Sequence, residues 1–398
     1  MIDPLPVLIV GAGPVGLSLA LALIQQDRPC IVFERRPELP DDPRATTLQP
    51  PVIERLKEWS ILDQVLMHSR VVREIEYWDW KKKSKIAGFQ LSELNDDTPT
   101  PYRLHCPQSV LCAHLLHAIE ALAPGTIRFS HTVQSASQND SRSEVLVSVQ
   151  PPEGPVLEFK GSFLAAADGV GSPVRRALNI PYEGRGTTHS FFTCEGTAEF
   201  DEHLRTQVSP PLAPASYLFT KSGWVLYMRM RDSVRLLYEI PHGQDLRESM
   251  SDDAIRRRTL ELVDENVMKH LTHRAVYRVQ PRVAVSYREG RVFLVGDAAH
   301  IAFPIGGTAM CTGILDAYHL AESIAQGTEA ALEDYAHSRR QDALHHLVAD
   351  SQASYRSLDA HNPLTRFTRN QFLAHAADRP ERARAHLRQI SMLASITP

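Results

Sequence analysis

Two short apolar runs near the start of the chain, Val7–Val10 and Cys30–Phe33, flank a longer and mostly apolar stretch, Leu17–Ile24. Runs of four apolar residues are typical of strands buried on both faces, and the stretch between them has the length of a helix. Similar runs at 163–166 and 291–295 predict two further buried strands. The pattern therefore predicts an α/β fold whose central sheet is built from segments far apart in the sequence.

Between residues 181 and 285 the pattern changes to short β-rich runs, several of which alternate between apolar and polar positions. Alternation with period two is typical of strands that have one face in a core and one in solvent. We expect an antiparallel sheet here, inserted between two parts of the first domain, with one helix over about 252–262. The expected strands are Ser190–Phe200, Ala215–Phe219, Trp224–Arg231 and Val234–Ile240.

The remaining elements complete a division of the chain into four parts. The first domain takes residues 1–180 and 286–335, the inserted sheet takes 181–285, and C-terminal helices take 336–398. We expect the chain to be mostly helical from Gly313 onward. Within 1–180 we expect helices at 51–67 and 108–122, a hairpin at 71–92, and strands at 127–133, 144–150 and 155–165.

The first apolar run leads into the pattern G-x-G-x-x-G at Gly11, Gly13 and Gly16, and the second run ends on Glu34. Glycines at this spacing allow a tight turn, the approach of a pyrophosphate to backbone amides, and close packing of the following helix. A carboxylate at the end of the second strand accepts hydrogen bonds from ribose hydroxyls. The pattern predicts nucleotide binding, and a glycine turn that serves only packing is the alternative. Neighbours expected to contact the nucleotide are Pro14, Val15 and Arg35.

Two later motifs each follow a predicted strand, with Asp168-Gly169 in the first and Gly296-Asp297 in the second. On local structure alone, the first would be an ordinary turn and Asp297 a helix N-cap. Together with G-x-G-x-x-G, these motifs resemble the fingerprint set of the class A flavoprotein monooxygenases, the para-hydroxybenzoate hydroxylase family. The resemblance covers nearly the whole chain. It implies an FAD-binding Rossmann-like domain of that type, an inserted antiparallel β-sheet substrate domain, and a C-terminal helical region.

The resemblance also implies roles for individual residues. Asp168 would lie by the riboses and pyrophosphate of FAD, and Asp297 would bind its ribityl chain. The carbonyl of Pro304 would face the reactive edge of the flavin, above the loop at Gly306 and Gly307. Arg44 would contact the cofactor and Gln108 the ribityl region, although a surface arginine and a helix-starting glutamine without a ligand are the alternatives. The loop continues into further expected cofactor contacts at Thr308, Ala309 and Met310.

The loop departs from the family pattern at two positions. Ala309 stands where relatives have glycine, and Cys311 where they have asparagine. The Cβ of alanine restricts the φ and ψ angles that the backbone can adopt compared with glycine, and a thiol is a weaker hydrogen-bond donor than an amide. We expect FAD binding to survive, with altered flavin geometry, reduction or coupling. Cys311 is either a small buried thiol that fills space or a redox-reactive one.

By resemblance, FAD would be reduced by NADH or NADPH and would react with dioxygen to a flavin hydroperoxide. This would hydroxylate an aromatic or polyketide-like small molecule. Baeyer–Villiger oxygenation of a ketone, and a non-redox cyclase or binding protein of the same fold, are the alternatives. The substrate pocket is expected between the inserted sheet and the flavin. Candidate lining residues, each of which could equally be sheet packing, are Tyr217, Trp224, Tyr227, Arg229 and Tyr238.

Composition limits the other classes of function. The chain has 398 residues, 43% of them apolar, and a formal net charge of −4, so it can bury a large core and does not suggest a nucleic-acid partner. The basic run 81–85 reads as the tip of the hairpin. Five cysteines without a C-x-x-C pair predict neither a metal site nor a disulfide framework. With no signal peptide and no membrane span expected, we predict a cytoplasmic protein; an oligomer is left open.

Overall fold

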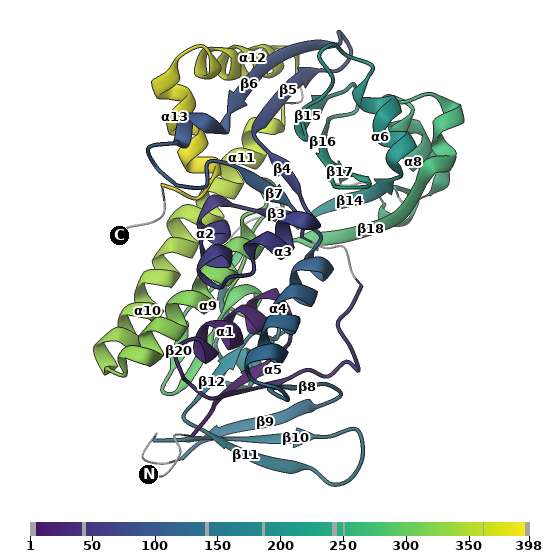
Figure 1. Ribbon diagram of the computed structural model, residues 1–398. Helices are drawn as coiled ribbons and strands as arrows, with labels where there is room; N and C mark the ends of the chain where they lie inside the picture. Colours follow the sequence, from purple (N-terminus) through teal and green to yellow (C-terminus); the bar gives the residue numbers. More distant parts are fainter. Residues whose placement is uncertain are drawn as a thin grey trace.

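The computed structural model describes residues 5–41, 45–139, 143–184, 188–240, 245–249, 251–360 and 362–394. Two large sheets lie at opposite ends of an elongated molecule, with a junction of small strands and helices between them (Figure 1). The N-terminal end of the chain lies in the lower part of Figure 1. The helices of the C-terminal region run from this lower part to the far end of the upper sheet.

The lower sheet has six strands in the order β20-β21-β12-β1-β2-β8, all parallel except the edge strand β20. Its central strands are fully apolar because helices or a second sheet cover both faces. The sequence predicted the central strands, and the structure confirms them. Their bounds are β1 Val7–Val10, β2 Cys30–Phe33, β8 Ile127–Arg128, β12 Phe163–Ala166, β20 Arg288–Glu289 and β21 Val292–Leu294.

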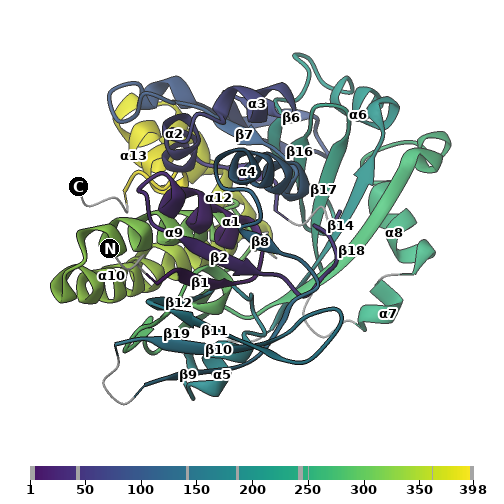
Figure 2. The ribbon, with the colours of Figure 1, turned by 60° about the horizontal axis from the view of Figure 1, so that its bottom comes forward.

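Helix α1 (Pro14–Ile24) packs between α4 (Gln108–Leu122) and α9 (Ala309–Gln326) on one face of this sheet (Figure 2). It is buried almost all round, which explains its lack of a polar face. A three-stranded sheet belongs to the same core, with Phe159 meeting Phe33 of β2 edge to face at 4.9 Å. Its strands are β9 Thr132–Gln138, β10 Val145–Gln150 and β11 Leu157–Gly161.

The upper sheet has seven strands in the order β18-β14-β17-β16-β15-β5-β6. The five strands from the inserted region pair antiparallel, as predicted. The hairpin β5–β6, which the sequence analysis assigned to the first domain, instead extends this sheet, and β5 runs parallel to β15. The bounds are β5 Glu74–Asp79, β6 Ser84–Gln90, β14 His189–Gly196, β15 Ala215–Phe219, β16 Trp224–Arg229, β17 Val234–Ile240 and β18 Leu271–Val279.

Helices cover both faces of the upper sheet. The outer face carries α6 (Ala198–Arg205) and α8 (Asp252–Thr259), and the inner face packs against the C-terminal helices. Only one helix was predicted in the insert, so α6 is a correction: the expected strand Ser190–Phe200 ends at Gly196 and a helix follows. The C-terminal helices are α10 Glu329–Asp342, α11 Ala349–Leu358, α12 Pro363–Ala377 and α13 Pro380–Ile390, with a π-helical turn at Ala343–Val348.

The junction between the two sheets contains the small sheet β3-β7-β4 and two helices (Figure 1). The helix predicted over 51–67 is in fact two helices, because Ser60 adopts a left-handed φ of 59° that ends the first one. A second small sheet consists of β13 (Tyr182–Glu183), β19 (Arg282–Ala284) and β22 (His300–Ile301), in that order. Junction elements are β3 Thr47–Leu48, α2 Pro50–Glu58, α3 Leu62–Met67, β4 Arg70–Val72 and β7 Arg103–His105.

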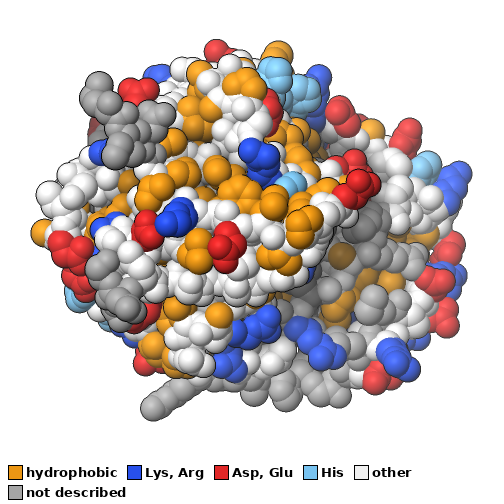
Figure 3. Space-filling view, turned by 90° about the horizontal axis from the view of Figure 1, so that it is seen from below, with side chains coloured by type: hydrophobic (Ala, Val, Ile, Leu, Met, Phe, Trp, Pro, Cys, Tyr) orange, Lys and Arg blue, Asp and Glu red, His pale blue; other side chains and the backbone are white. Residues whose placement is uncertain are grey.

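Acidic and basic side chains are interspersed over the face of the molecule seen in Figure 3, with apolar side chains between them. Among the described residues, no helix is long and apolar enough to cross a membrane. The same residues contain no cluster of three or more side chains suited to hold a metal ion.

Candidate functional site

The turn between β1 and α1 is shaped by contacts that only glycine permits. Gly11 has a φ of 102°, and its amide donates to the carbonyl of Phe33 at 2.8 Å. A Cβ on Gly16 would lie 2.0 Å from the carbonyl oxygen of Gly11. A Cβ on Gly13 would instead project into open space. Gly13 is the N-cap of α1, and no side chain of the described residues caps the helix, so amides of its first turn remain available to a pyrophosphate.

Glu34 anchors the end of β2 beside this turn. Its Oε2 accepts from the amide of Ala12 at 2.9 Å, and its Oε1 accepts from the amide of Arg36 at 3.0 Å. A carboxylate has about four acceptor positions, so these bonds orient Glu34 and leave capacity for ribose hydroxyls. Arg35 is exposed at the same strand end. Arg44 lies outside the described residues.

Asp168 contributes a buried acceptor from the end of β12. Its Oδ2 accepts from the amide of Val174 at 3.2 Å, while its Oδ1 is buried and has no hydrogen-bond partner among the described residues. Burial raises the pKa of Asp168 above its ordinary value. An unsatisfied buried acceptor beside a nucleotide turn fits a bound ligand that carries hydroxyl donors. FAD has such groups on its ribose and its ribityl chain.

The third motif is held in place by Asp316 of α9. Its Oδ2 accepts from the amide of Gly296 at 3.2 Å and from Nε2 of His300 at 2.8 Å, and its Oδ1 accepts from Nε of Arg339 at 2.9 Å. Burial alone would raise the pKa of Asp316, but His300 and Arg339 outweigh it and lower the pKa. Asp297 itself is exposed at this strand end, where a ligand can reach it. The positioning role of Asp316 was not predicted from the sequence.

The loop after this motif is fixed by the junction. Gly306 and Gly307 have φ values of 83° and 65°, and a Cβ on Gly307 would lie 2.5 Å from the Cβ of Thr47 in β3. Nε2 of Gln49 donates to the carbonyl of Gly306 at 2.6 Å. Pro304 and the loop glycines are partly exposed, so a ligand can contact their backbone. Neither Thr47 nor Gln49 was singled out from the sequence, since their role depends on a contact between distant segments.

The two departures from the family pattern fit this local structure. Ala309 is the first residue of α9, whose helical backbone any residue adopts, so glycine is not required there. Cys311 is fully buried, and its thiol donates to the carbonyl of Thr47 at 3.3 Å. Burial raises the pKa of Cys311 to about 12. The thiol therefore stays protonated at neutral pH, which favours the space-filling interpretation.

This burial has a measurable consequence for all five cysteines, because each one is a buried thiol that is not part of a disulfide bond. We expect native protein at pH 8 to react with no thiol within minutes of adding an aromatic disulfide reagent, and to react with all five after denaturation. The measurement is the absorbance of the released thiolate. Rapid reaction of Cys311 in the native protein would show that this thiol is accessible and would support the alternative interpretation, a redox-reactive cysteine.

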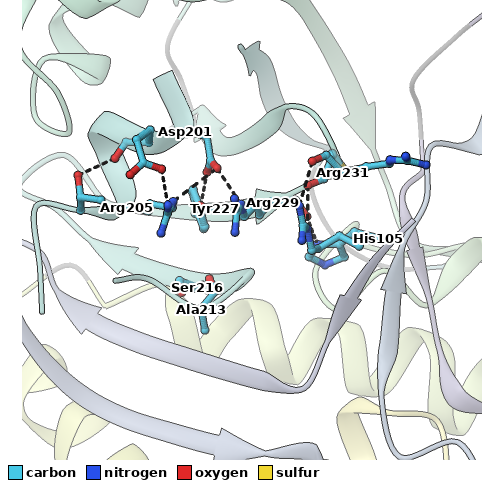
Figure 4. A network of polar contacts seen from close by, with 12 residues as sticks. His105, Asp201, Arg205, Ala213, Ser216, Tyr227, Arg229 and Arg231 are labelled. Carbon is cyan, nitrogen blue, oxygen red and sulfur yellow. Dashed lines mark hydrogen bonds and ion pairs between the residues drawn. The ribbon is translucent and has the colours of Figure 1, made fainter. Parts of the chain in front are cut away.

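The five candidate pocket residues divide between the two faces of the upper sheet. Tyr217 and Trp224 belong to the inner face, which packs toward the loop at Phe303 and Ile305. Tyr227, Arg229 and Tyr238 instead point to the outer face, where Asp201 of α6 accepts from the Tyr227 hydroxyl and, at 2.8 Å, from Nε of Arg229 (Figure 4). Positions an odd number of residues apart on one strand face opposite sides. These three residues therefore cannot line a pocket that faces the loop.

The inner face also contacts the loop Pro304–Gly307, which we call the candidate flavin loop. The Tyr217 hydroxyl lies beside the backbone of Gly306, and the Thr46 hydroxyl lies 3.7 Å from the sulfur of Met228. A cavity of about 730 Å³ is lined by Gly306 and, from the C-terminal region, by Ile390. The inner face of the upper sheet therefore contacts the loop that follows the third nucleotide motif.

Another cavity, of about 640 Å³, lies further along the same inner face. It is lined by Trp224 and by Tyr355 of α11, among others. The ring of Tyr355 stacks on Phe303, with ring centroids 4.8 Å apart. Since Phe303 directly precedes Pro304, this cavity ends close to the loop. Both cavities have volumes in the range of small-molecule sites.

Comparison with known proteins identifies the class of protein to which this fold and these nucleotide motifs belong. The family model described as "FAD binding domain" matches residues 4–350. The chain therefore belongs to this family and is a FAD-dependent monooxygenase of class A, the aromatic hydroxylases. The resemblance inferred from the sequence motifs is thereby confirmed.

Individual relatives span most of the chain. It is 30% identical over 325 residues to 6-hydroxy-3-succinoylpyridine 3-monooxygenase HspB of Pseudomonas putida (strain DSM 28022 / S16), covering 80% of this chain and 79% of that protein. It is 27% identical over 375 residues to para-nitrophenol 4-monooxygenase of Pseudomonas sp. (strain WBC-3), covering 90% and 89%. The crystal structure of p-nitrophenol 4-monooxygenase PnpA from Pseudomonas putida DLL-E4 superposes with a TM-score of 0.88 over 98% of both chains, at 24% identity, which shows a shared fold.

Proposed function

We propose that the protein uses NADH or NADPH and dioxygen to hydroxylate a small aromatic or polyketide-like molecule. The observation that supports this most is the contact between the inner face of the upper sheet and the loop Pro304–Gly307, where Tyr217 lies beside Gly306. The relatives support the substrate class, since p-nitrophenol and 6-hydroxy-3-succinoylpyridine are aromatic compounds. A structural relative, aklavinone-11 hydroxylase with FAD and aklavinone, has a TM-score of 0.77 at 26% identity and covers 90% of this chain and 70% of its own.

Different residues of the three nucleotide motifs would bind different parts of FAD. The α1 amides would bind the pyrophosphate, Glu34 and Asp168 the ribose, and Asp297 the ribityl chain. When bound, FAD supplies electron transfer from the nicotinamide and the activation of dioxygen. The N-terminus of α9 at Ala309 would place its positive dipole end near the flavin ring and stabilise negative charge on it. The apolar inner face would exclude water from the reacting atoms.

Isotopically labelled dioxygen tests this proposal. The holoenzyme, supplied with NADPH or NADH and a panel of phenols and heteroaromatic alcohols, should place one labelled atom in a new hydroxyl group of the product. Substrate should also accelerate the oxidation of the nicotinamide. Mass spectrometry of the product, with the nicotinamide absorbance followed in parallel, measures both. Protein stripped of flavin provides the control and should convert nothing.

Other outcomes would assign a different reaction. Label in an inserted ester oxygen would identify Baeyer–Villiger oxygenation. Product without label and without nicotinamide consumption would identify a non-redox cyclase. Either result would overturn hydroxylation while leaving FAD binding intact.

A further inference from the structure

The small sheet β13-β19-β22 joins the segments that follow the second and third nucleotide motifs. In its middle strand, Ala284 pairs with Tyr182 of β13, and Val283 pairs with His300 of β22. β13 follows the second motif along the chain, and β22 follows the third. β13 and β19 also lie at the two ends of the inserted region, 181–285. The sheet therefore connects the two motifs at the place where the inserted region begins and ends.

The hydroxyl of Tyr182 reaches from this sheet to the third motif. It donates to the backbone carbonyl of Asp297 at 2.6 Å. Asp297 lies in a single short turn, Gly296–Ala298, in which few backbone groups bond to one another. The carbonyl and the side chain of Asp297 are attached to the same Cα. A bond that fixes this carbonyl therefore also restricts where the carboxylate can point.

The ring of Tyr182 is held in turn by Arg175, which belongs to the second motif. Arg175 lies in α5 (Pro173–Ala177) and is only 9% exposed. Its guanidinium carbon lies 3.8 Å from the centroid of the Tyr182 ring, a cation–π contact. Nη1 of Arg175 donates to the carbonyl of Ile180 at 2.8 Å, which keeps the guanidinium in place. Tyr182 thus contacts the second motif through its ring and the third through its hydroxyl.

The surroundings of Tyr182 keep its hydroxyl protonated. Burial raises the pKa of Tyr182 to about 12; Arg175 opposes this rise, and the negative charges of Asp297 and Asp168 add to it. The hydroxyl therefore remains a donor at neutral pH. The same charges show that the carboxylates of both motifs lie near this one side chain.

We propose that Tyr182 is a positioning residue for FAD: its hydroxyl orients Asp297 before FAD binds, so that the carboxylate already faces the ribityl chain. This inference rests on the proposed role of Asp297 and adds to it a residue outside the three motifs. A side chain that is ordered in advance loses less conformational entropy when the ligand binds. The adenosine diphosphate half of FAD would be bound by the first motif and would not depend on Tyr182.

The test compares two holoenzymes in which a tyrosine loses only its hydroxyl. Tyr182→Phe keeps the ring beside Arg175 and removes the bond to Asp297. The matched control is Tyr335→Phe. It removes a bond of the same kind, from the Tyr335 hydroxyl to the carbonyl of Leu294 at 3.0 Å, in the strand that leads into the third motif. The rate of FAD release is measured as the flavin that passes a centrifugal filter over time.

We expect opposite effects from the two variants. Tyr182→Phe should release FAD about tenfold faster than wild type, and the melting temperature of its flavin-free form should fall by no more than about 2 °C. Tyr335 is only 2% exposed, so Tyr335→Phe should lower the melting temperature more and release FAD within about threefold of the wild-type rate. A purely structural role of Tyr182 would instead make FAD release follow the melting temperature in both variants.

ADP provides a second comparison, because it has the adenosine and pyrophosphate of FAD but no ribityl chain. Its affinity, measured by competition with FAD, should be the same for Tyr182→Phe as for wild type. Equal weakening of ADP and FAD would overturn the proposal, since it would show that Tyr182 supports the first motif as well. FAD release from Tyr182→Phe no faster than from Tyr335→Phe would also overturn it.

Asp297→Ala separates this inference from the role of Asp297 on which it depends. If this variant retains FAD as wild type does, the assignment of Asp297 to the ribityl chain fails, and the inference fails with it. If Asp297→Ala releases FAD faster while Tyr182→Phe does not, the role of Tyr182 alone is overturned. Faster release from both variants, with unchanged ADP affinity, is the result that we expect.

Discussion

Replacing Asp316 by alanine should lower the free energy of unfolding by about 3–5 kcal/mol, because it leaves buried His300 and Arg339 without their shared acid. For a protein whose total stability is of the order of 5–15 kcal/mol, that is a large share. The same change removes the acceptor of the Gly296 amide, so the third nucleotide motif should loosen and FAD should be retained poorly. Urea unfolding, with flavin fluorescence followed in parallel, measures both effects.

The pH dependence gives a second check on Asp316. Its pKa is lowered in the folded state, so its contribution to stability is fully present above its unfolded pKa, about 4, and is lost as pH falls through the folded value. The difference between wild type and Asp316→Ala should therefore shrink in acid. As a control, Glu183→Gln removes a largely exposed partner of Arg340 and should cost no more than about 1 kcal/mol. Similar costs for the two variants would contradict the structural importance of the buried group.

Gly16→Ala is expected to abolish FAD binding and to destabilise the fold. The new Cβ would lie 2.0 Å from the backbone oxygen of Gly11, and neither backbone can move without separating α1 from β1. Overpacking of this kind costs about 1–3 kcal/mol or more. The measurements are the flavin content of purified protein and the melting temperature of the flavin-free form.

Gly13→Ala is the matched comparison. Its Cβ meets no atom within 4 Å, and its φ of −76° suits alanine, so the flavin-free protein should melt as wild type does. Its FAD affinity should nevertheless fall, because the methyl group would occupy the path of the pyrophosphate. If Gly13→Ala retained FAD normally, the pyrophosphate could not lie where we place it.

What could be predicted from the sequence was local. The strand, glycine turn and helix at 7–24 follow from the spacing of apolar residues and glycines, and α4 has the predicted bounds. The alternation of side chains between the two faces of a strand could also have been applied to the sequence. Trp224 and Tyr227 are an odd number of positions apart, so only one of them could face the flavin side.

What could not be predicted depends on contacts between distant segments. Asp316 is one residue of a motif until the structure brings Gly296, His300 and Arg339 to it. Arg103 is an ordinary charged residue in the sequence, and its burial becomes apparent only from the structure, where it donates to Ile390 at the end of α13. The helix predicted at 51–67 is divided by the positive φ of Ser60. This could not be predicted because a positive φ is usually indicated by glycine, and here the residue is serine.

The parallel pairing of β5 with β15 bears on how the chain reaches its folded state. The register pairs Tyr77 with Tyr217, about 140 positions further along the chain, so forming this part of the upper sheet closes a long loop. Contacts between such distant residues slow folding, because the entropy of closing the loop is lost before the contact forms. A fragment cut at the ends of the insert would expose the edge of β15 as an unpaired strand prone to association. The upper sheet is therefore not a module that can be excised or exchanged on its own: engineered chimaeras would have to transfer residues 70–90 together with the insert.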